Sequence, residues 1–174
     1  MRLFLALVPP PELRERLGEL ADAAHAHYGG RRMPDESLHQ TLAFLGEVSD
    51  VQATELVDWV RRLTVPPGEW RLDAWGHFRR PGILWVGGHS PDPALGRLQK
   101  QLWDALEGFG LAGRPTRFVP HVTLLRRADI LGVSTLGVSN LPTPDLIWSY
   151  RHLALVRSFT LDDGASYTTL ARSS

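Results

Sequence analysis

The chain has no cysteine among its 174 residues. This absence excludes disulfide frameworks, thiolate zinc sites, iron–sulfur clusters and a cysteine nucleophile together. Net charge is also absent, because nineteen Lys and Arg residues balance nineteen Asp and Glu residues. Bulk attraction to nucleic acid or to an anionic membrane is therefore not expected, and such a partner has to be bound by a local group of charges.

Long apolar runs are missing as well. The first run, residues 3–8, is six residues long and ends at three consecutive prolines. A secretory signal needs about 7 to 15 apolar residues and a membrane span about 20. The sequence therefore predicts a cytoplasmic protein without membrane association. With 43% hydrophobic and 22% charged residues, we expect one globular domain over 1–174 with a sizeable core.

Hydrophobic periodicity predicts strands that alternate with helices. The expected helices span 11–27, 50–63 and 93–107, and the expected strands span 3–8, 38–45, 69–78, 83–88 and 117–125. Residues 131–145 are expected to form a loop. A hairpin of 150–160 with 166–171 around Asp163-Gly164 is expected to complete the chain.

This order contains an internal repeat. The strand, helix and strand at 3–8, 11–27 and 38–45 recur at 83–88, 93–107 and 117–125. Each copy ends in the motif H-x-T-L, at residues 39–42 and again at 121–124, and the two histidines are 121 − 39 = 82 residues apart. A repeated unit that carries a repeated polar pair predicts a site with pseudo-twofold symmetry.

The two motifs supply the residues for acid–base chemistry. Side chains alternate along a strand, so His39 shares a face with Thr41, and His121 shares a face with Thr123. Two imidazoles with pKa values near 6.5 can act as one acid and one base at neutral pH. If the two strands face each other, their histidines favour a group-transfer reaction in which both the attack and the departure of the leaving group involve transfer of a proton.

Two further candidates follow the histidines by five residues. Phe44 follows His39 and Arg126 follows His121 at this distance, and strict alternation would turn both away from the histidine face. A β-bulge or a strand end would turn them in. Arg126 could then contact phosphate or base, and Phe44 could stack on a base. For Phe44, burial in the core is the alternative.

No metal site is expected. His25 and His27 lie two residues apart on a predicted helix and face different sides, and the remaining histidines have no partner at a ligand spacing. Residues 108–113 match G-x-G-x-x-G, but they follow a helix and precede a strand, which is the reverse of the dinucleotide-binding order. The sequence therefore predicts no cofactor.

The paired motifs resemble those of the two-histidine (2H) phosphoesterases, and among these the RNA 2′,3′-cyclic phosphodiesterases, which are similar to 2′-5′ RNA ligases. The matching stretches are residues 2–7, 38–48, 120–126 and 155–158. The resemblance implies an α/β fold of the α+β type. In that fold, two antiparallel sheets flank a central cleft, helices lie outside, and two pseudo-twofold lobes form one domain.

The resemblance also implies an activity and roles. The expected reaction opens RNA 2′,3′-cyclic phosphate ends to 2′-phosphates without metal, and some members join RNA ends in reverse. His121 would activate water and His39 would protonate the 3′ oxygen, while Thr41 and Thr123 would hold the phosphate. Alternatives are hydrolysis of small cyclic nucleotides or ADP-ribose cyclic phosphate, and an RNA-binding or tRNA-handling module. The expected partners are RNA or cyclic nucleotides, and a monomer is expected.

Overall fold

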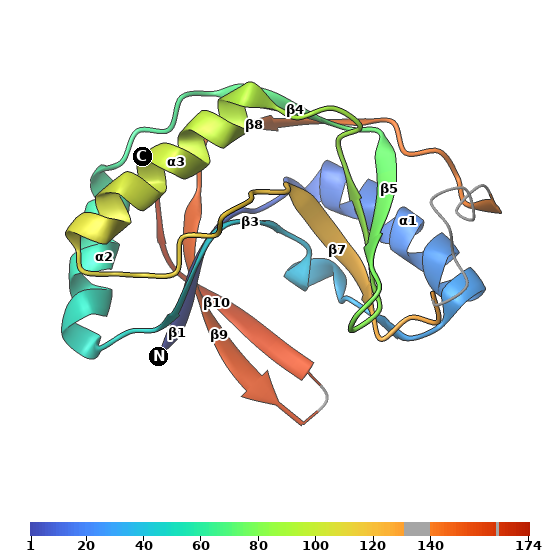
Figure 1. The fold of residues 1–174 in the computed structure, drawn as a ribbon, viewed down its shortest axis with the longest axis horizontal. Helices are drawn as coiled ribbons and strands as arrows, with labels where there is room; N and C mark the ends of the chain where they lie inside the picture. Colours follow the sequence, from blue (N-terminus) through green and yellow to red (C-terminus); the bar gives the residue numbers. More distant parts are fainter. Residues whose placement is uncertain (131–139, 163) are drawn as a thin grey trace.

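The computed structural model describes residues 1–130, 140–162 and 164–174 (Figure 1). Its helices within these residues are α1 (Pro11–Tyr28), α2 (Asp50–Arg62), α3 (Pro93–Gly108) and a short 3-10 helix, η1 (Asp35–Ser37). Its strands are β1 (Arg2–Leu7), β2 (Arg31–Arg32), β3 (Gln40–Glu47), β4 (Gly68–Leu72), β5 (Ala74–Phe78), β6 (Ile83–Gly87), β7 (His121–Arg126), β8 (Leu146–Tyr150), β9 (Ala154–Leu161) and β10 (Gly164–Arg172).

Most of the strands form one antiparallel sheet in the order β10-β9-β1-β3-β7-β6-β5, with β2 added beside β7. The register between β3 and β7 has one pair, Gln40 with Val122, whereas β1 and β3 share six pairs. We call β10-β9-β1-β3 the first half-sheet and β7-β6-β5 the second. Strands β4 and β8 form a separate two-stranded sheet.

The helices cover one side of these sheets. Helix α1 packs on β7, α2 on β9 and β10, and α3 on β3 and β4 (Figure 1). The core lies beneath them and contains the fully buried Leu3, Leu5 and Leu7 of β1. Since side chains alternate along β1, Phe4 and Ala6 lie on the other face of the sheet, where they form a smaller cluster.

Local signals explain where the helices begin. The side chain of Ser49 accepts a hydrogen bond from the backbone N–H of Gln52, whose side chain accepts one in return from Ser49. The Asp92 carboxylate accepts from the backbone N–H of Leu95 in the same way. None of the helices in the described part of the chain is long and apolar enough to cross a membrane.

The predicted α+β class with antiparallel sheets and outer helices is confirmed. The prediction of one strand over 69–78 is wrong. The strand is interrupted at Asp73, and the strands before and after it, β4 and β5, belong to different sheets. The carboxylate of Asp73 accepts a hydrogen bond from the distant backbone N–H of His89 at 2.6 Å. Sequence patterns do not reveal such a contact.

Two other boundaries differ from the prediction. The expected strand over 150–160 begins only at Ala154, as β9, while Tyr150 is the last residue of a separate strand, β8, which was not expected. Strand β7 begins at His121 rather than at Arg117. Part of the predicted loop, residues 131–139, and Asp163 of the predicted turn lie outside the described residues.

Candidate active site

The junction of the two half-sheets brings the H-x-T-L motifs together. Gln40 and Val122 form the register pair between β3 and β7, and both side chains are buried. The neighbours of each paired residue project from the opposite face of the sheet. These neighbours are His39 and Thr41 on one strand and His121 and Thr123 on the other. The structure therefore gathers both predicted histidines and both threonines on one face.

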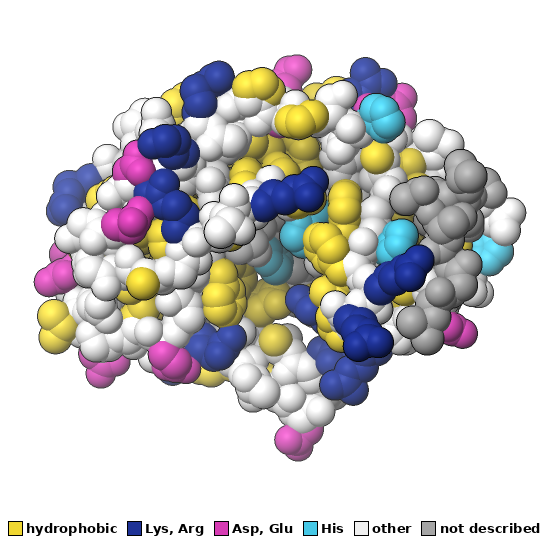
Figure 2. Space-filling model, in the orientation of Figure 1, with side chains coloured by type: hydrophobic (Ala, Val, Ile, Leu, Met, Phe, Trp, Pro, Cys, Tyr) yellow, Lys and Arg dark blue, Asp and Glu magenta, His cyan; other side chains and the backbone are white. Residues whose placement is uncertain are grey.

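The same region is hollowed. Figure 2 shows a depression in the middle of this face, with histidine side chains inside it and Lys or Arg side chains around it. His39 and His121 are both partly exposed. A small anion can therefore reach the two imidazoles from solvent. The positive side chains around the depression favour its approach.

Each histidine is held by a backbone carbonyl. The Nδ1 atom of His39 lies 2.7 Å from the carbonyl oxygen of Ser37, and the Nδ1 atom of His121 lies 2.7 Å from that of Val119. A carbonyl only accepts hydrogen bonds, so Nδ1 is the donor in both rings. The Nε2 atom is therefore the one that is free to exchange a proton. At His39 this atom lies 2.9 Å from the Thr41 hydroxyl, which donates to it in the neutral ring.

The surroundings lower both histidine pKa values. Burial lowers the pKa of His39 from 6.5 to about 4, and the positive charges of Arg126 and His121 act in the same direction. The hydrogen bond to Ser37 opposes them. Burial also lowers the pKa of His121, helped by Arg126 and opposed by the bond to Val119. Both rings are therefore mainly neutral at pH 7, and a bound anion would favour their protonation.

Aromatic rings flank each imidazole. The ring centroids of Phe4 and Tyr167 lie 4.8 and 5.3 Å from that of His39. Those of Phe78 and Trp85 lie 5.3 and 5.6 Å from that of His121. The edge contacts of Tyr167 and Phe78 restrict the planes of the two imidazole rings.

A β-bulge follows the threonine in both motifs. In the register, Thr41 is opposite Ala6 and Ala43 is opposite Leu5, so Leu42 has no partner. Thr123 and Leu125 likewise face consecutive residues of β6, which leaves out Leu124. The extra residue shifts the alternation by one position. Phe44 and Arg126 therefore lie on the histidine face. A bulge of this kind is what the sequence required for these two residues to contribute to the site.

The structure decides the environment of Phe44. Its side chain is 51% exposed, so the alternative of burial in the core is wrong. The guanidinium of Arg2 lies 5.2 Å from the centroid of its ring. Arg126 is partly exposed, and its charge affects the pKa values of both His39 and His121.

Sequence reasoning missed the aromatic neighbours and Arg2. Arg2 and Phe4 belong to a strand whose alternation separates them from Leu3 and Leu5, so this pattern could have placed them on one face. No comparable signal exists for Tyr167. It reaches His39 only because β10 pairs with β9, which in turn pairs with β1.

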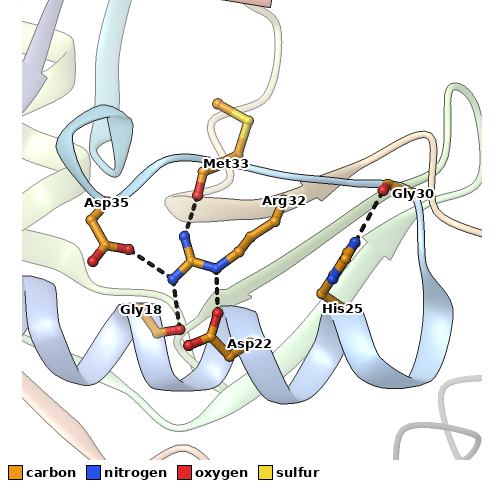
Figure 3. Close-up of polar contacts among 7 residues, drawn as sticks. All are labelled: Gly18, Asp22, His25, Gly30, Arg32, Met33 and Asp35. Atoms are coloured by element: carbon orange, nitrogen blue, oxygen red, sulfur yellow. Dashed lines mark hydrogen bonds and ion pairs between the residues drawn. The ribbon is translucent and has the colours of Figure 1, made fainter.

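An arginine outside the site holds the segment that precedes His39. The guanidinium of Arg32 donates to the carboxylates of Asp22 and Asp35, at 2.6 and 2.7 Å, and to the carbonyl oxygens of Gly18 and Met33 (Figure 3). These contacts join α1 to the chain that runs through η1. That chain continues to Ser37, whose carbonyl binds His39.

The other histidines do not gather. The Nε2 atom of His25 donates one hydrogen bond, to the carbonyl oxygen of Gly30 at 3.3 Å (Figure 3). Within the ranges that the structure describes, no group of three or more His, Asp or Glu side chains could hold a metal ion.

Comparison with known proteins adds sequence relatives. A family model described as the 2′-5′ RNA ligase superfamily matches residues 9–158. An RNA 2′,3′-cyclic phosphodiesterase of Escherichia coli (strain K12) is 34% identical over 162 residues, which cover 92% of this chain and 85% of that protein. A protein of the same name from Thermus thermophilus is 29% identical over 189 residues, with 99% and 89% coverage.

Solved structures are similar over the same extent. E. coli LigT complexed with 3′-AMP has a TM-score of 0.81 and 32% identity, and covers 98% of this chain and 95% of LigT. The crystal structure of a phosphoesterase has a TM-score of 0.82 and 30% identity, and covers 98% of this chain and 96% of that one. Both similarities extend over nearly the whole chain, and the family match includes both H-x-T-L motifs.

Proposed function

As a member of the 2′-5′ RNA ligase superfamily, the chain is an enzyme that hydrolyses RNA 2′,3′-cyclic phosphates, and we propose that His39 and His121 are its acid and base. The observation that carries this proposal is the shared geometry of the two rings. Each donates from Nδ1 to a backbone carbonyl at 2.7 Å, which leaves Nε2 for proton transfer on one face of the sheet.

In the proposed reaction, Nε2 of His121 takes a proton from water as the water oxygen bonds to phosphorus. The bond between phosphorus and the ribose 3′ oxygen breaks, and Nε2 of His39 gives its proton to that oxygen. The product carries a 2′-phosphate and a 3′-hydroxyl. After the reaction His121 is protonated and His39 is neutral. Proton exchange with solvent restores the starting state of both rings.

This division of roles requires the substrate to change the charge state of His39. In the free enzyme, burial and the charges of Arg126 and His121 hold the pKa of His39 near 4. A cyclic phosphate is an anion, and an anion beside the ring stabilises the imidazolium. The substrate therefore brings about the protonation that the acid needs.

Thr41 and Thr123 would donate hydrogen bonds to the phosphate oxygens, where negative charge grows in the transition state. Thr41 donates to His39 in the free enzyme. Once His39 binds a proton at Nε2, that bond is lost and the hydroxyl is released toward the phosphate. Arg126 would compensate the phosphate charge, and Phe44 would stack on the terminal base.

The two half-sheets would act as two lobes of one domain, each with one motif. The same groups could join two RNA ends through a 2′-5′ bond if a ribose 5′-hydroxyl replaced water as the nucleophile, with His121 taking its proton and His39 protonating the 3′ oxygen as before. RNA with a cyclic end is the favoured substrate, since the relatives are named for it.

The test uses an oligonucleotide that ends in a 2′,3′-cyclic phosphate, with phosphorus NMR of the product. The wild-type enzyme should yield the 2′-phosphate, and His39→Ala and His121→Ala should retain binding but lose most of their turnover. A dominant 3′-phosphate would reverse the roles of the two motifs. A kcat close to that of the wild-type enzyme in either variant would remove the two-histidine mechanism.

A further inference from the structure

A cavity of about 630 Å³ lies outside the group of residues described above. It is bounded by the connection from β1 to α1, by residues 148–154, which join β8 to β9, and by the end of β10. Its volume is in the range of small-molecule sites, about 300 to 1,000 Å³. None of the proposed catalytic residues lines it.

The sheet connects this cavity to the histidine site. Arg172 and Ala154, which both line the cavity, are register partners on β10 and β9. Ala154 pairs with Ala6, and Ala6 pairs with Thr41, which binds His39. Register partners in an antiparallel sheet project from the same face. The cavity and the histidines therefore share a face, with Arg172 about 14 Å from Thr41 at strand spacings of about 4.8 Å.

The charged groups of the cavity are cationic. Arg151 and Arg172 line it and are exposed, and no Asp or Glu is among its lining residues. Neither arginine forms an ion pair with a carboxylate in the described ranges of the chain. His152 also lines the cavity, and its buried Nδ1 atom has no hydrogen-bond partner among the described residues. Guanidinium groups without carboxylate partners are suited to phosphate.

A terminal cyclic phosphate occupies both the 2′ and the 3′ oxygens of its ribose, so the RNA chain continues only through the 5′ oxygen. We propose that this cavity binds the RNA strand on the 5′ side of the cyclic phosphate, with Arg151 and Arg172 on its backbone phosphates. The inference rests on the proposed function, and it names RNA longer than one nucleotide as the preferred substrate. At about 14 Å from Thr41, Arg172 would meet a phosphate upstream of the reacting one.

Hydrolysis of a cyclic mononucleotide is compared with that of oligonucleotides of increasing length that end in the same cyclic nucleotide. We expect KM to fall as the oligonucleotide lengthens. Arg151→Gln and Arg172→Gln should each raise KM for the longer substrates about tenfold, which is typical of a lost hydrogen bond to a charged group. Both variants should leave KM and kcat for the mononucleotide unchanged. Arg62→Gln is the matched control, since Arg62 is an exposed arginine on α2, which packs against the other face of the sheet.

Salt dependence gives a second measurement. For binding of an oligonucleotide with a 2′-phosphate end, the slope of log K against log salt should become shallower by about 0.7 for each arginine removed. Equal changes in KM for mononucleotide and oligonucleotide would overturn the proposal, and so would no change with either. If the wild-type enzyme failed to hydrolyse any cyclic-ended oligonucleotide, the proposed function itself would fail, which is a different result.

Discussion

Gln40 and Val122 occupy equivalent positions in the two repeats, 122 − 40 = 82 residues apart, and they pair directly across the junction of the half-sheets. The pseudo-twofold axis therefore passes between the two motifs. The carbonyls that bind the histidines, at Ser37 and Val119, have the same separation. The pairing of Gln40 with Val122 thus sets the arrangement of the two histidines, and backbone carbonyls rather than carboxylates orient their rings.

The first prediction concerns the coupling of His39 and His121. We expect His39→Ala and His121→Ala each to lower kcat by about 100-fold to 10,000-fold, which is typical of a lost acid or base. Because the two rings act in one proton transfer sequence, the double variant should be little slower than either single one. Single-turnover kinetics on a cyclic-ended oligonucleotide measure this. Multiplicative losses in the double variant would show that the rings act independently.

The second prediction concerns pH. The active free enzyme holds one protonated and one neutral ring, and kcat/KM reports the pKa values of the free enzyme. Both pKa values are lowered from 6.5, that of His39 to about 4. The optimum of kcat/KM should therefore lie below pH 6.5, and the rate should fall as pH rises through the higher of the two values, above which neither ring carries the proton that the acid must donate.

Arg126 provides the check on this profile, because its charge lowers both pKa values. Arg126→Gln should shift the profile of kcat/KM to higher pH, whereas Arg126→Lys should leave its position unchanged. An unchanged profile in Arg126→Gln would mean that burial alone lowers the pKa values.

The sequence was sufficient for the part of the site that depends on local periodicity. His39 and Thr41 share a face because strands alternate, and the repeat supplied the second motif. The bulges at Leu42 and Leu124 were needed to place Phe44 and Arg126, but no residue type marks them. Tyr167 could not be found, since its position beside His39 depends on two pairings between strands distant in sequence.

The third prediction concerns Arg32. Arg32→Ala removes four hydrogen bonds, two of them to carboxylates. We expect a stability loss of about 1 to 2 kcal/mol because the site is partly exposed, which corresponds to a Tm lower by about 2 to 8 °C. Below the melting transition, kcat should fall more than KM rises, because Ser37 no longer holds the His39 ring.

The matched control for Arg32 is Asp22→Asn, which removes the charge of one exposed partner while the bonds to Gly18 and Met33 remain. It should change Tm little and kcat not at all. A normal kcat in a destabilised Arg32→Ala protein would restrict Arg32 to a structural role.

The last prediction separates base binding from chemistry. Phe44 is 51% exposed on the histidine face beneath Arg2, so Phe44→Ala should leave Tm nearly unchanged. If Phe44 stacks on the terminal base, KM should rise about 5-fold to 150-fold, since a stacked base contributes about 1 to 3 kcal/mol. Thr41→Ala and Thr123→Ala should instead lower kcat with smaller effects on KM, because their hydroxyls meet charge that grows in the transition state.

Phe159 offers a matched control for Phe44. It is 38% exposed, and the guanidinium of Arg157 lies 4.2 Å from the centroid of its ring. Arg157 is the register partner of Leu3, a core residue, so the pair lies on the face of the sheet away from His39. Phe159→Ala therefore removes an equivalent arginine–aromatic contact without touching the site, and KM should be that of the wild-type enzyme. Equal increases in KM in Phe44→Ala and Phe159→Ala would mean that loss of an arginine–aromatic pair, rather than of base stacking, weakens binding.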